Sequence, residues 1–140
     1  MGIRFPTAEW TSAFKDAINA NAAYAEAGSE WTHGSVAYVV AARPDLGLPE
    51  ERAMLLDLHR GSCRDAQLVD AAQAQEADFV IRAEYEEWRE VLSGEVDPTK
   101  AMMQNRLRLE KGHLPTLVKF VVASRELVRS AATIDTEYPA

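Results

Sequence analysis

The sequence contains very little cysteine and histidine. Cys63 is its single cysteine, so neither an internal disulfide nor a multi-cysteine metal site can form. The three histidines, His33, His59 and His113, stand in separate parts of the chain, and no two of them have the short spacing typical of metal ligands. We therefore expect no metal and no other cofactor. A lone thiol also fits a reducing compartment, and we expect the protein to be cytoplasmic.

Long apolar runs are absent as well. The longest, Val36 to Ala42, is far shorter than the ~20 residues that span a bilayer, and the N-terminus lacks the charged-then-apolar pattern of a signal peptide. The last residues, Glu137 to Ala140, do not match a peroxisomal address. These absences predict a protein without a membrane anchor, which makes at most transient contact with a membrane.

Basic residues are too few for a nucleic-acid partner. The chain has 15 Lys and Arg against 22 Asp and Glu, which gives a net charge of -7. Contacts to phosphates need clustered lysine and arginine, so we expect no nucleic acid, and anionic membrane surfaces are disfavoured too. With 47% hydrophobic and 26% charged residues in 140, the chain is predicted to form one globular domain, 1–140.

Catalytic motifs are also missing. The sequence has no nucleophile elbow, phosphate-binding loop or dinucleotide-binding fingerprint. Cys63 lies within a predicted strand, where a small buried hydrophobic role is commoner than that of a nucleophile. Glu84, Glu86 and Glu87 form an acidic run, but such runs typically mark the solvated start of a helix. We expect no catalytic residues and predict that the protein is not an enzyme.

The sequence does contain a clear succession of helices and strands. Apolar residues at helical spacing follow Thr7, a typical N-cap, and continue to Gly28, which predicts one helix over this stretch. A turn at Gly61-Ser62 joins two strands of a predicted hairpin. After the first helix we expect a strand at 36–43, the two hairpin strands at 53–60 and 63–69, and a loop at 70–77. A strand at 78–83 and a helix at 84–94 follow.

The segment that follows carries dense start and stop signals. Asp97-Pro98 is typical of a helix start, and Asn105 can adopt the left-handed conformation that ends a short helix. Residues 106–110 alternate polar and apolar, as a half-buried strand does. A longer helix is predicted after the turn at 111–112, and apolar residues cover well over half of its circumference. Such a helix is either deeply buried or forms the wall of a cavity.

The order of these elements predicts the fold class. Strands and helices are grouped in runs, which is the pattern of an α+β protein and not of an alternating α/β protein. We expect a single mixed sheet of about five strands with helices packed on one face. The last residues, 133–140, are predicted to fray or to wrap around the surface.

A run of residues in the C-terminal half carries a family resemblance: Trp88, Leu92, Gly94, Asp97-Pro98, Ala101, Met102-Met103, Leu107-Arg108-Leu109 and Gly112, with the apolar helix after them. This half resembles the sterol carrier protein type 2 domain, a family of lipid-binding proteins, and the earlier half is similar to it more loosely. The resemblance implies an apolar tunnel between the sheet and the C-terminal helices. Asn105-Arg106 departs from the glycine and lysine usual in the family, but asparagine can also take a left-handed turn.

Soft apolar side chains mark the candidate ligand-binding site. Methionine is flexible and polarizable, so Met102 and Met103 suit a wall that adapts to its ligand, although the residues by themselves favour plain core packing. Given the resemblance, we expect a fatty acyl chain, a sterol-like or a quinone-like lipid as the ligand. Burying ~16 methylenes at ~0.8 kcal/mol each contributes on the order of 10 kcal/mol before the entropy of association. The expected wall residues are Trp88, Val91, Leu92, Met102, Met103, Leu107, Leu109, Leu114, Leu117, Phe120 and Val121.

Two other functions remain open at this point. The same apolar helices could dock a partner protein or a second copy of the chain, which would make the protein a non-catalytic interaction module or a homodimer. An enzyme acting on a lipid held in the tunnel has the least support, because it needs converging polar groups that sequence spacing alone does not reveal.

Overall fold

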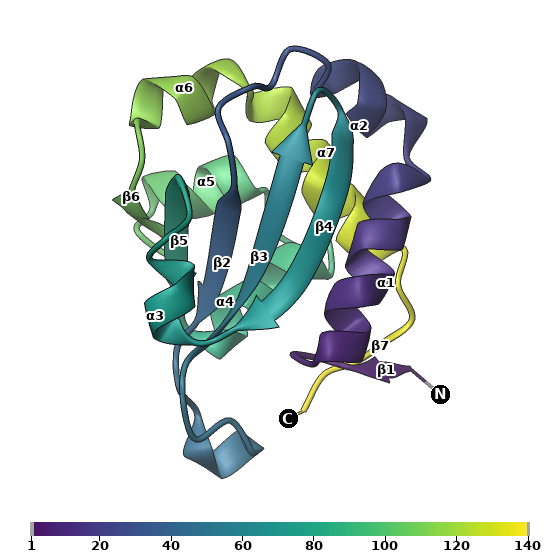
Figure 1. Cartoon of the computed structure of the whole chain (residues 1–140). Coiled ribbons are helices and arrows are strands. Elements are labelled where there is room, and N and C mark those ends of the chain that lie inside the picture. The colour runs from purple at the N-terminus through teal and green to yellow at the C-terminus, as the bar shows by residue number, and fades with distance from the viewer. Residues whose placement is uncertain (1, 140) are drawn as a thin grey trace.

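A mixed five-stranded sheet organises residues 2–139, the part of the chain that the computed structural model describes (Figure 1). Its strands are β2 (Val36–Val40), β3 (Arg52–His59), β4 (Ser62–Val69), β5 (Phe79–Ala83) and β6 (Arg108–Lys111). They lie in the order β4-β3-β2-β5-β6. β2 and β5 are parallel, and the other neighbouring strands are antiparallel. The predicted α+β class is confirmed.

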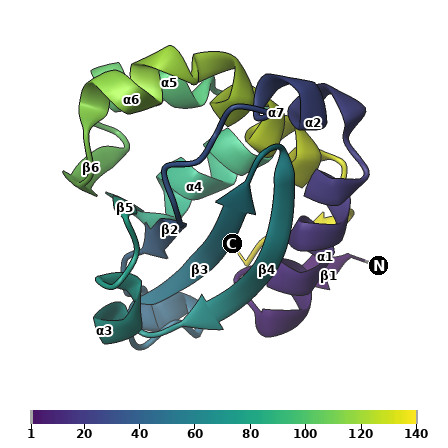
Figure 2. The ribbon, with the colours of Figure 1, turned by 45° about the horizontal axis from the view of Figure 1, so that its top comes forward.

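The helices lie mainly on one face of this sheet (Figure 2). A short two-stranded parallel sheet pairs the ends of the chain, β1 (Ile3–Arg4) with β7 (Thr136–Glu137). The helices are α1 (Ala8–Asn19), α2 (Ala22–Ala27), α3 (Ala71–Ala74), α4 (Tyr85–Leu92), α5 (Pro98–Met103), α6 (Leu114–Lys119) and α7 (Val121–Ala132), with a 3-10 turn at Pro44–Leu46.

β2 is the middle strand, and both of its faces are covered. All of its residues are buried. Tyr38 and Val40 pack into the main core beneath the helices, whereas Ala37 and Val39 belong to a smaller cluster on the opposite face. Its β-branched and aromatic residues suit a strand buried on both sides.

The β3–β4 hairpin turns one residue earlier than predicted. Leu58 pairs with Cys63 and His59 with Ser62, which leaves Arg60 and Gly61 as the turn. Both turn residues have positive φ, 49° and 84°, the backbone geometry of the tight turns that match the twist of a hairpin.

The single N-terminal helix predicted up to Gly28 is wrong, because Asn21 breaks it into α1 and α2. The Asn21 side chain accepts the backbone N–H groups of Ala23 and Tyr24 and so caps α2. Its Nδ2 also donates to the Glu126 carbonyl at 3.2 Å and to Ser130 Oγ at 3.0 Å on α7. The break therefore depends on a contact with a helix more than a hundred residues away.

The loop predicted at 70–77 contains the short helix α3. Asp70 accepts the N–H of Gln73, and the Gln73 side chain reaches back to the Asp70 N–H, which completes a capping box. Ala74 and Ala77 pack with Ala37 and Val80 on the face of the sheet opposite the other helices (Figure 2). The alanine-rich segment is thus a small cover for this second face.

The single long C-terminal helix predicted after Gly112 is also wrong, because Phe120 separates α6 from α7. Phe120 has φ -102° and ψ 33°, outside helical geometry, and its ring is buried. The ring packs edge-on against Trp31, with the ring centroids 5.1 Å apart. This aromatic contact fixes the corner between the two helices, which leave it in different directions (Figure 1).

The C-terminal segment wraps back onto the start of the chain, one of the two behaviours predicted for 133–140. Trp10 Nε1 donates to Thr136 Oγ1 at 2.9 Å, and the Tyr85 hydroxyl donates to the Pro139 carbonyl. Ala140 lies outside the described residues. Within those residues no helix has the length and apolarity needed to cross a membrane.

Candidate functional site

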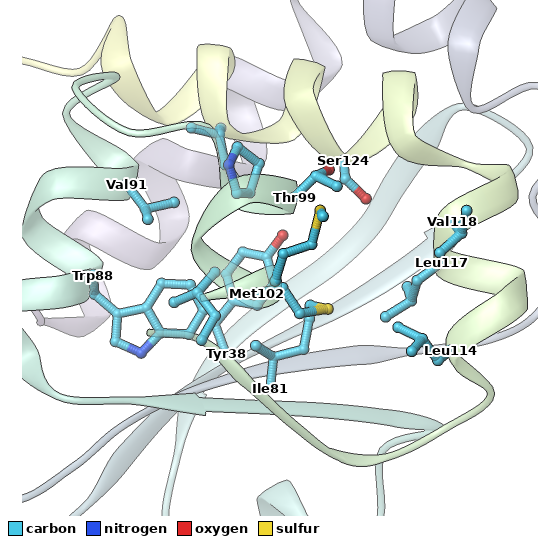
Figure 3. A pocket seen from close by; sticks show the side chains of 14 residues that line it. Tyr38, Ile81, Trp88, Val91, Thr99, Met102, Leu114, Leu117, Val118 and Ser124 are labelled. Carbon is cyan, nitrogen blue, oxygen red and sulfur yellow. The ribbon is translucent and has the colours of Figure 1, made fainter. Parts of the chain in front are cut away.

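An apolar pocket lies between the sheet and helices α4 to α7 (Figure 3). Its volume is about 160 Å³. Strands β2 and β5 form its floor, and α5, α6 and the start of α7 form its roof. It is lined by Tyr38, Ile81, Trp88, Val91, Pro98, Thr99, Met102, Met103, Leu107, Leu114, Leu117, Val118, Ser124 and Val128.

The floor of the pocket is rigid and aromatic. Tyr38 and Ile81 are register partners on the parallel strands β2 and β5, so their side chains lie side by side on the same face. The Trp88 indole stacks on Tyr38, with ring centroids 4.8 Å apart and planes at 28°. Its Nε1 donates to the Val39 carbonyl at 2.7 Å, which satisfies the buried N–H and presents the apolar ring to the pocket.

One side of the roof is clamped in place. Asp97 caps α5 by accepting the Thr99 N–H at 2.8 Å, and Asn105 takes φ 60° just after the helix, as the sequence predicted. Arg106 then makes ion pairs with Glu87 and Glu90 of α4. These contacts tie the connection between α5 and β6 to α4, at the edge of the pocket.

The other side of the roof, α6, is held much more loosely. None of its residues is buried. Leu114 and Val118 line the pocket yet remain 49% and 59% exposed, and Met103 is 82% exposed. These exposed apolar side chains form the rim of the pocket, where it opens to solvent.

A second, smaller cavity of about 30 Å³ adjoins the first on its inner side. Tyr38, Ile81, Leu117 and Ser124 line both cavities, so they form the wall between them. The inner cavity extends toward Tyr24, Trp31 and Phe120. A ligand longer than the first cavity would therefore continue inward past Leu117.

No charged side chain of the described residues lines either cavity. The lining residues that carry hydroxyl groups are Tyr38 and Ser124 in both cavities, Thr99 in the first and Tyr24 in the second. Burial raises the pKa of Tyr38, and the neighbouring Tyr24 adds to the shift. Burial also raises the pKa of Tyr24. Both phenols are therefore neutral at physiological pH.

The lone thiol and any metal cluster are the remaining candidate sites. Cys63 lies outside both cavities in the strand β4, and it is buried as the sequence predicted. Burial raises the pKa of its thiol to about 11, so the nucleophilic thiolate is disfavoured. Within residues 2–139 no three His, Cys, Asp or Glu residues lie close enough to hold a metal ion.

Seven of the eleven expected wall residues meet around the first cavity: Trp88, Val91, Met102, Met103, Leu107, Leu114 and Leu117. The other four lie elsewhere. Leu92, on α4, is fully buried in the main core. Leu109, on β6, is half-buried and packs against that core. Phe120 lines the inner cavity, and Val121 is half-buried at the start of α7.

Sequence reasoning missed the pocket residues that come from distant or polar positions. Tyr38 and Ile81 lie on strands that were predicted, but the strand pairing decides which face the C-terminal helices cover. Thr99 and Ser124 lack the apolar character by which wall residues were selected. The lining residues that were not predicted are Tyr38, Ile81, Pro98, Thr99, Val118, Ser124 and Val128.

The fold and the site define an α+β protein that has an uncharged, mainly apolar pocket between its sheet and a helical roof. The family model for the SCP-2 sterol transfer family matches residues 14–120, and the chain belongs to this family. The resemblance found in the sequence is thereby confirmed. Membership of this family supports lipid binding or transfer as the general function. Proteins of the family are generally lipid carriers and not enzymes.

Solved structures give the same result. One described as sterol carrier protein 2 is 40% identical, with a TM-score of 0.86 over 91% of this chain and 97% of that one. A Thermus thermophilus protein described as possibly a sterol carrier protein is 38% identical, with a TM-score of 0.86 over 97% of this chain and 93% of its own. Sterol carrier protein 2 from Yarrowia lipolytica, at 14% identity and a TM-score of 0.56 over 88% of this chain and 89% of that one, shares the fold. The comparison with curated proteins gave no match.

Proposed function

We propose that this protein is an intracellular carrier that binds one lipid, a fatty acyl chain or a sterol-like or quinone-like molecule, in the pocket beneath α5 and α6. The observation that carries the proposal is the uncharged pocket of about 160 Å³, lined mainly by apolar side chains and open at a rim of exposed apolar residues. The 40% identity to a sterol carrier protein 2 supports it. The lipid would be held by desolvated contact area, without a charged group.

The size of the pocket sets how a lipid would fit. An apolar cavity of ~150 Å³ accommodates a molecule of about the size of benzene. The first cavity therefore takes a ring or a short stretch of chain. A whole acyl chain would need the inner cavity as well, which requires Leu117 to move. Since Leu117 lies on α6, the helix without buried residues, a shift of α6 would both admit the lipid and join the two cavities.

Ligand identification and a pair of variants test this function. Organic extraction followed by mass spectrometry should find bound lipid, and a fluorescent fatty acid should bind saturably and change the tryptophan emission. Leu117→Asp places a charge in the wall between the cavities and should weaken binding by at least tenfold. Val122→Asp, on an exposed side chain outside both linings, is the matched control and should leave binding unchanged. Circular dichroism checks that both variants fold. The absence of both lipid and saturable binding would defeat the proposal.

A second candidate function is that of an interaction module. Met103, Leu114, Val118 and Val122 expose large apolar side chains, which also fits a surface that docks a partner protein or a second copy of the chain. Size-exclusion chromatography with light scattering separates the two functions. A docking surface predicts an oligomer that added lipid does not change, whereas a carrier predicts that lipid binds whatever the oligomeric state.

A further inference from the structure

The hydroxyl of Tyr38 has no hydrogen-bond partner within residues 2–139. The residue is only 5% exposed, yet its hydroxyl makes no hydrogen bond with any described residue. Most of the other buried aromatic side chains that carry a polar atom do have partners: Trp31 Nε1 donates to the Gly34 carbonyl at 2.9 Å, and Trp10, Trp88 and Tyr85 make the bonds given above. The Tyr24 hydroxyl also makes no hydrogen bond with the described residues, but Tyr24 lines the inner cavity alone, whereas Tyr38 lines both. In the described chain no side-chain nitrogen or oxygen is both fully enclosed and unpartnered. The Tyr38 oxygen therefore has accessible surface, and this surface belongs to the cavities that Tyr38 lines.

A second hydroxyl faces the same place from the opposite layer. Ser124 on α7 also lines both cavities, and its hydroxyl makes no hydrogen bond with the described residues. Ser130, further along the same helix, shows the usual alternative, because its Oγ donates to the Glu126 carbonyl at 2.9 Å. In Figure 3 the Tyr38 hydroxyl points from the sheet toward the helical roof, where Ser124 and Thr99 lie.

These groups constrain the chemistry of a ligand. An apolar ligand that fills the cavities would cut these hydroxyls off from solvent without giving them a partner, which costs free energy, and a ligand oxygen placed at the junction of the cavities would avoid that cost. Lysine, arginine and histidine are absent from the lining, as far as the described residues go, so an ionised carboxylate would be desolvated there without a counter-charge. A neutral oxygen fits the site, whereas an ionised headgroup does not.

We propose that the Tyr38 and Ser124 hydroxyls bind an uncharged oxygen, a hydroxyl or carbonyl, of the lipid at the point where the two cavities meet. The inference rests on the proposed carrier function and narrows its ligand class to neutral oxygen-bearing lipids, such as alcohols and ketones with a ring or chain body. A fatty acid would bind with its ionised carboxylate at the rim instead. Tyr38 and Ser124 are then specificity residues of the pocket.

A matched pair of small probes tests the inference. Butylbenzene and 4-butylphenol differ by one hydroxyl, and both are uncharged at pH 7. The dissociation constant of each is measured by NMR titration for the wild-type protein and for the variants Tyr38→Phe and Ser124→Ala. The quantity compared is the ratio of the two dissociation constants, in which the difference in probe solvation cancels between proteins. The preference for 4-butylphenol should fall about three- to tenfold in Tyr38→Phe and in the same direction in Ser124→Ala.

Tyr85→Phe provides the control, because it removes a tyrosine hydroxyl that bonds to Pro139 away from both cavities. Its ratio should equal that of the wild type. A ratio unchanged in both Tyr38→Phe and Ser124→Ala overturns the inference. So does failure of both probes to bind while a fluorescent fatty acid still binds, and in that case the carrier function stands. Failure of all three ligands to bind defeats the carrier function itself.

Discussion

Single side chains decide the character of the pocket, and Trp88 shows how. Its indole N–H is satisfied by the Val39 carbonyl, so a polar atom is anchored in the sheet while the apolar ring faces the ligand space. Tyr38 is different, because its hydroxyl has no hydrogen-bond partner in the described chain and faces the cavities. The two stacked residues therefore differ in role: Trp88 provides an apolar wall, whereas Tyr38 also provides a hydroxyl that can hydrogen-bond.

Cys63 gives a prediction about pH. Burial raises the pKa of its thiol from 9.0 to about 11, so the folded state keeps a proton that the unfolded state releases. Its contribution to stability is complete below pH 9 and is lost as the pH rises toward 11. We expect the free energy of unfolding of the wild type to fall over this range by on the order of 2 kcal/mol more than that of Cys63→Ala. Urea titrations at several pH values measure both, and parallel pH profiles would contradict the prediction.

At the scale of elements, the contrast between the two sides of the pocket roof is decisive. α5 and its connection to β6 are held by a cap, a left-handed residue and ion pairs to α4. α6 has no buried residue and is fixed mainly at its C-terminal end, where Phe120 packs on Trp31. We infer that α6 is the element that moves when a lipid enters.

Hydrogen exchange tests the role of α6. Amides of α6 should exchange faster than those of α4, whose Trp88, Val91 and Leu92 are buried, because a helix without buried side chains opens at low cost. Added fatty acid should slow exchange in α6 and leave α4 little changed. Mass spectrometry of proteolytic fragments resolves the two helices. Equal protection of α4 and α6 in the ligand-free protein would count against α6 as the mobile part.

At the scale of the whole molecule, ligand binding and stability are coupled. A lipid that binds only the folded chain should raise the free energy of unfolding by about 2.7 kcal/mol when its free concentration is ~100 times the dissociation constant. The melting temperature should rise accordingly in a thermal scan. Leu117→Asp should lose about half of this increment or more, since tenfold weaker binding at the same lipid concentration leaves ~1.4 kcal/mol, while Val122→Asp should retain it. A melting temperature that does not respond to saturating lipid would show that the lipid binds the unfolded chain equally or not at all.

The elements that were predicted correctly are those specified by local signals. Asp97-Pro98 starts α5, and Asn105 ends it with positive φ. The alternation in β3 and the apolar run of β2 also yield strands, because side-chain period and burial are properties of neighbouring residues. The helix breaks at Asn21 and Phe120 were missed since their causes, α7 and Trp31, lie far away in the sequence.

The sequence by itself determined the α+β class, the family and the apolar bias of the C-terminal half, because these follow from local periodicity, motifs and composition. Only the tertiary structure decided where that bias forms a pocket. In the folded chain Tyr38 and Ile81 lie beneath α5 and α6, Phe120 lines the inner cavity, and Leu92 is buried in the core. The physical reason is that a cavity is made by surfaces from distant segments, and which surfaces meet depends on strand pairing and helix packing.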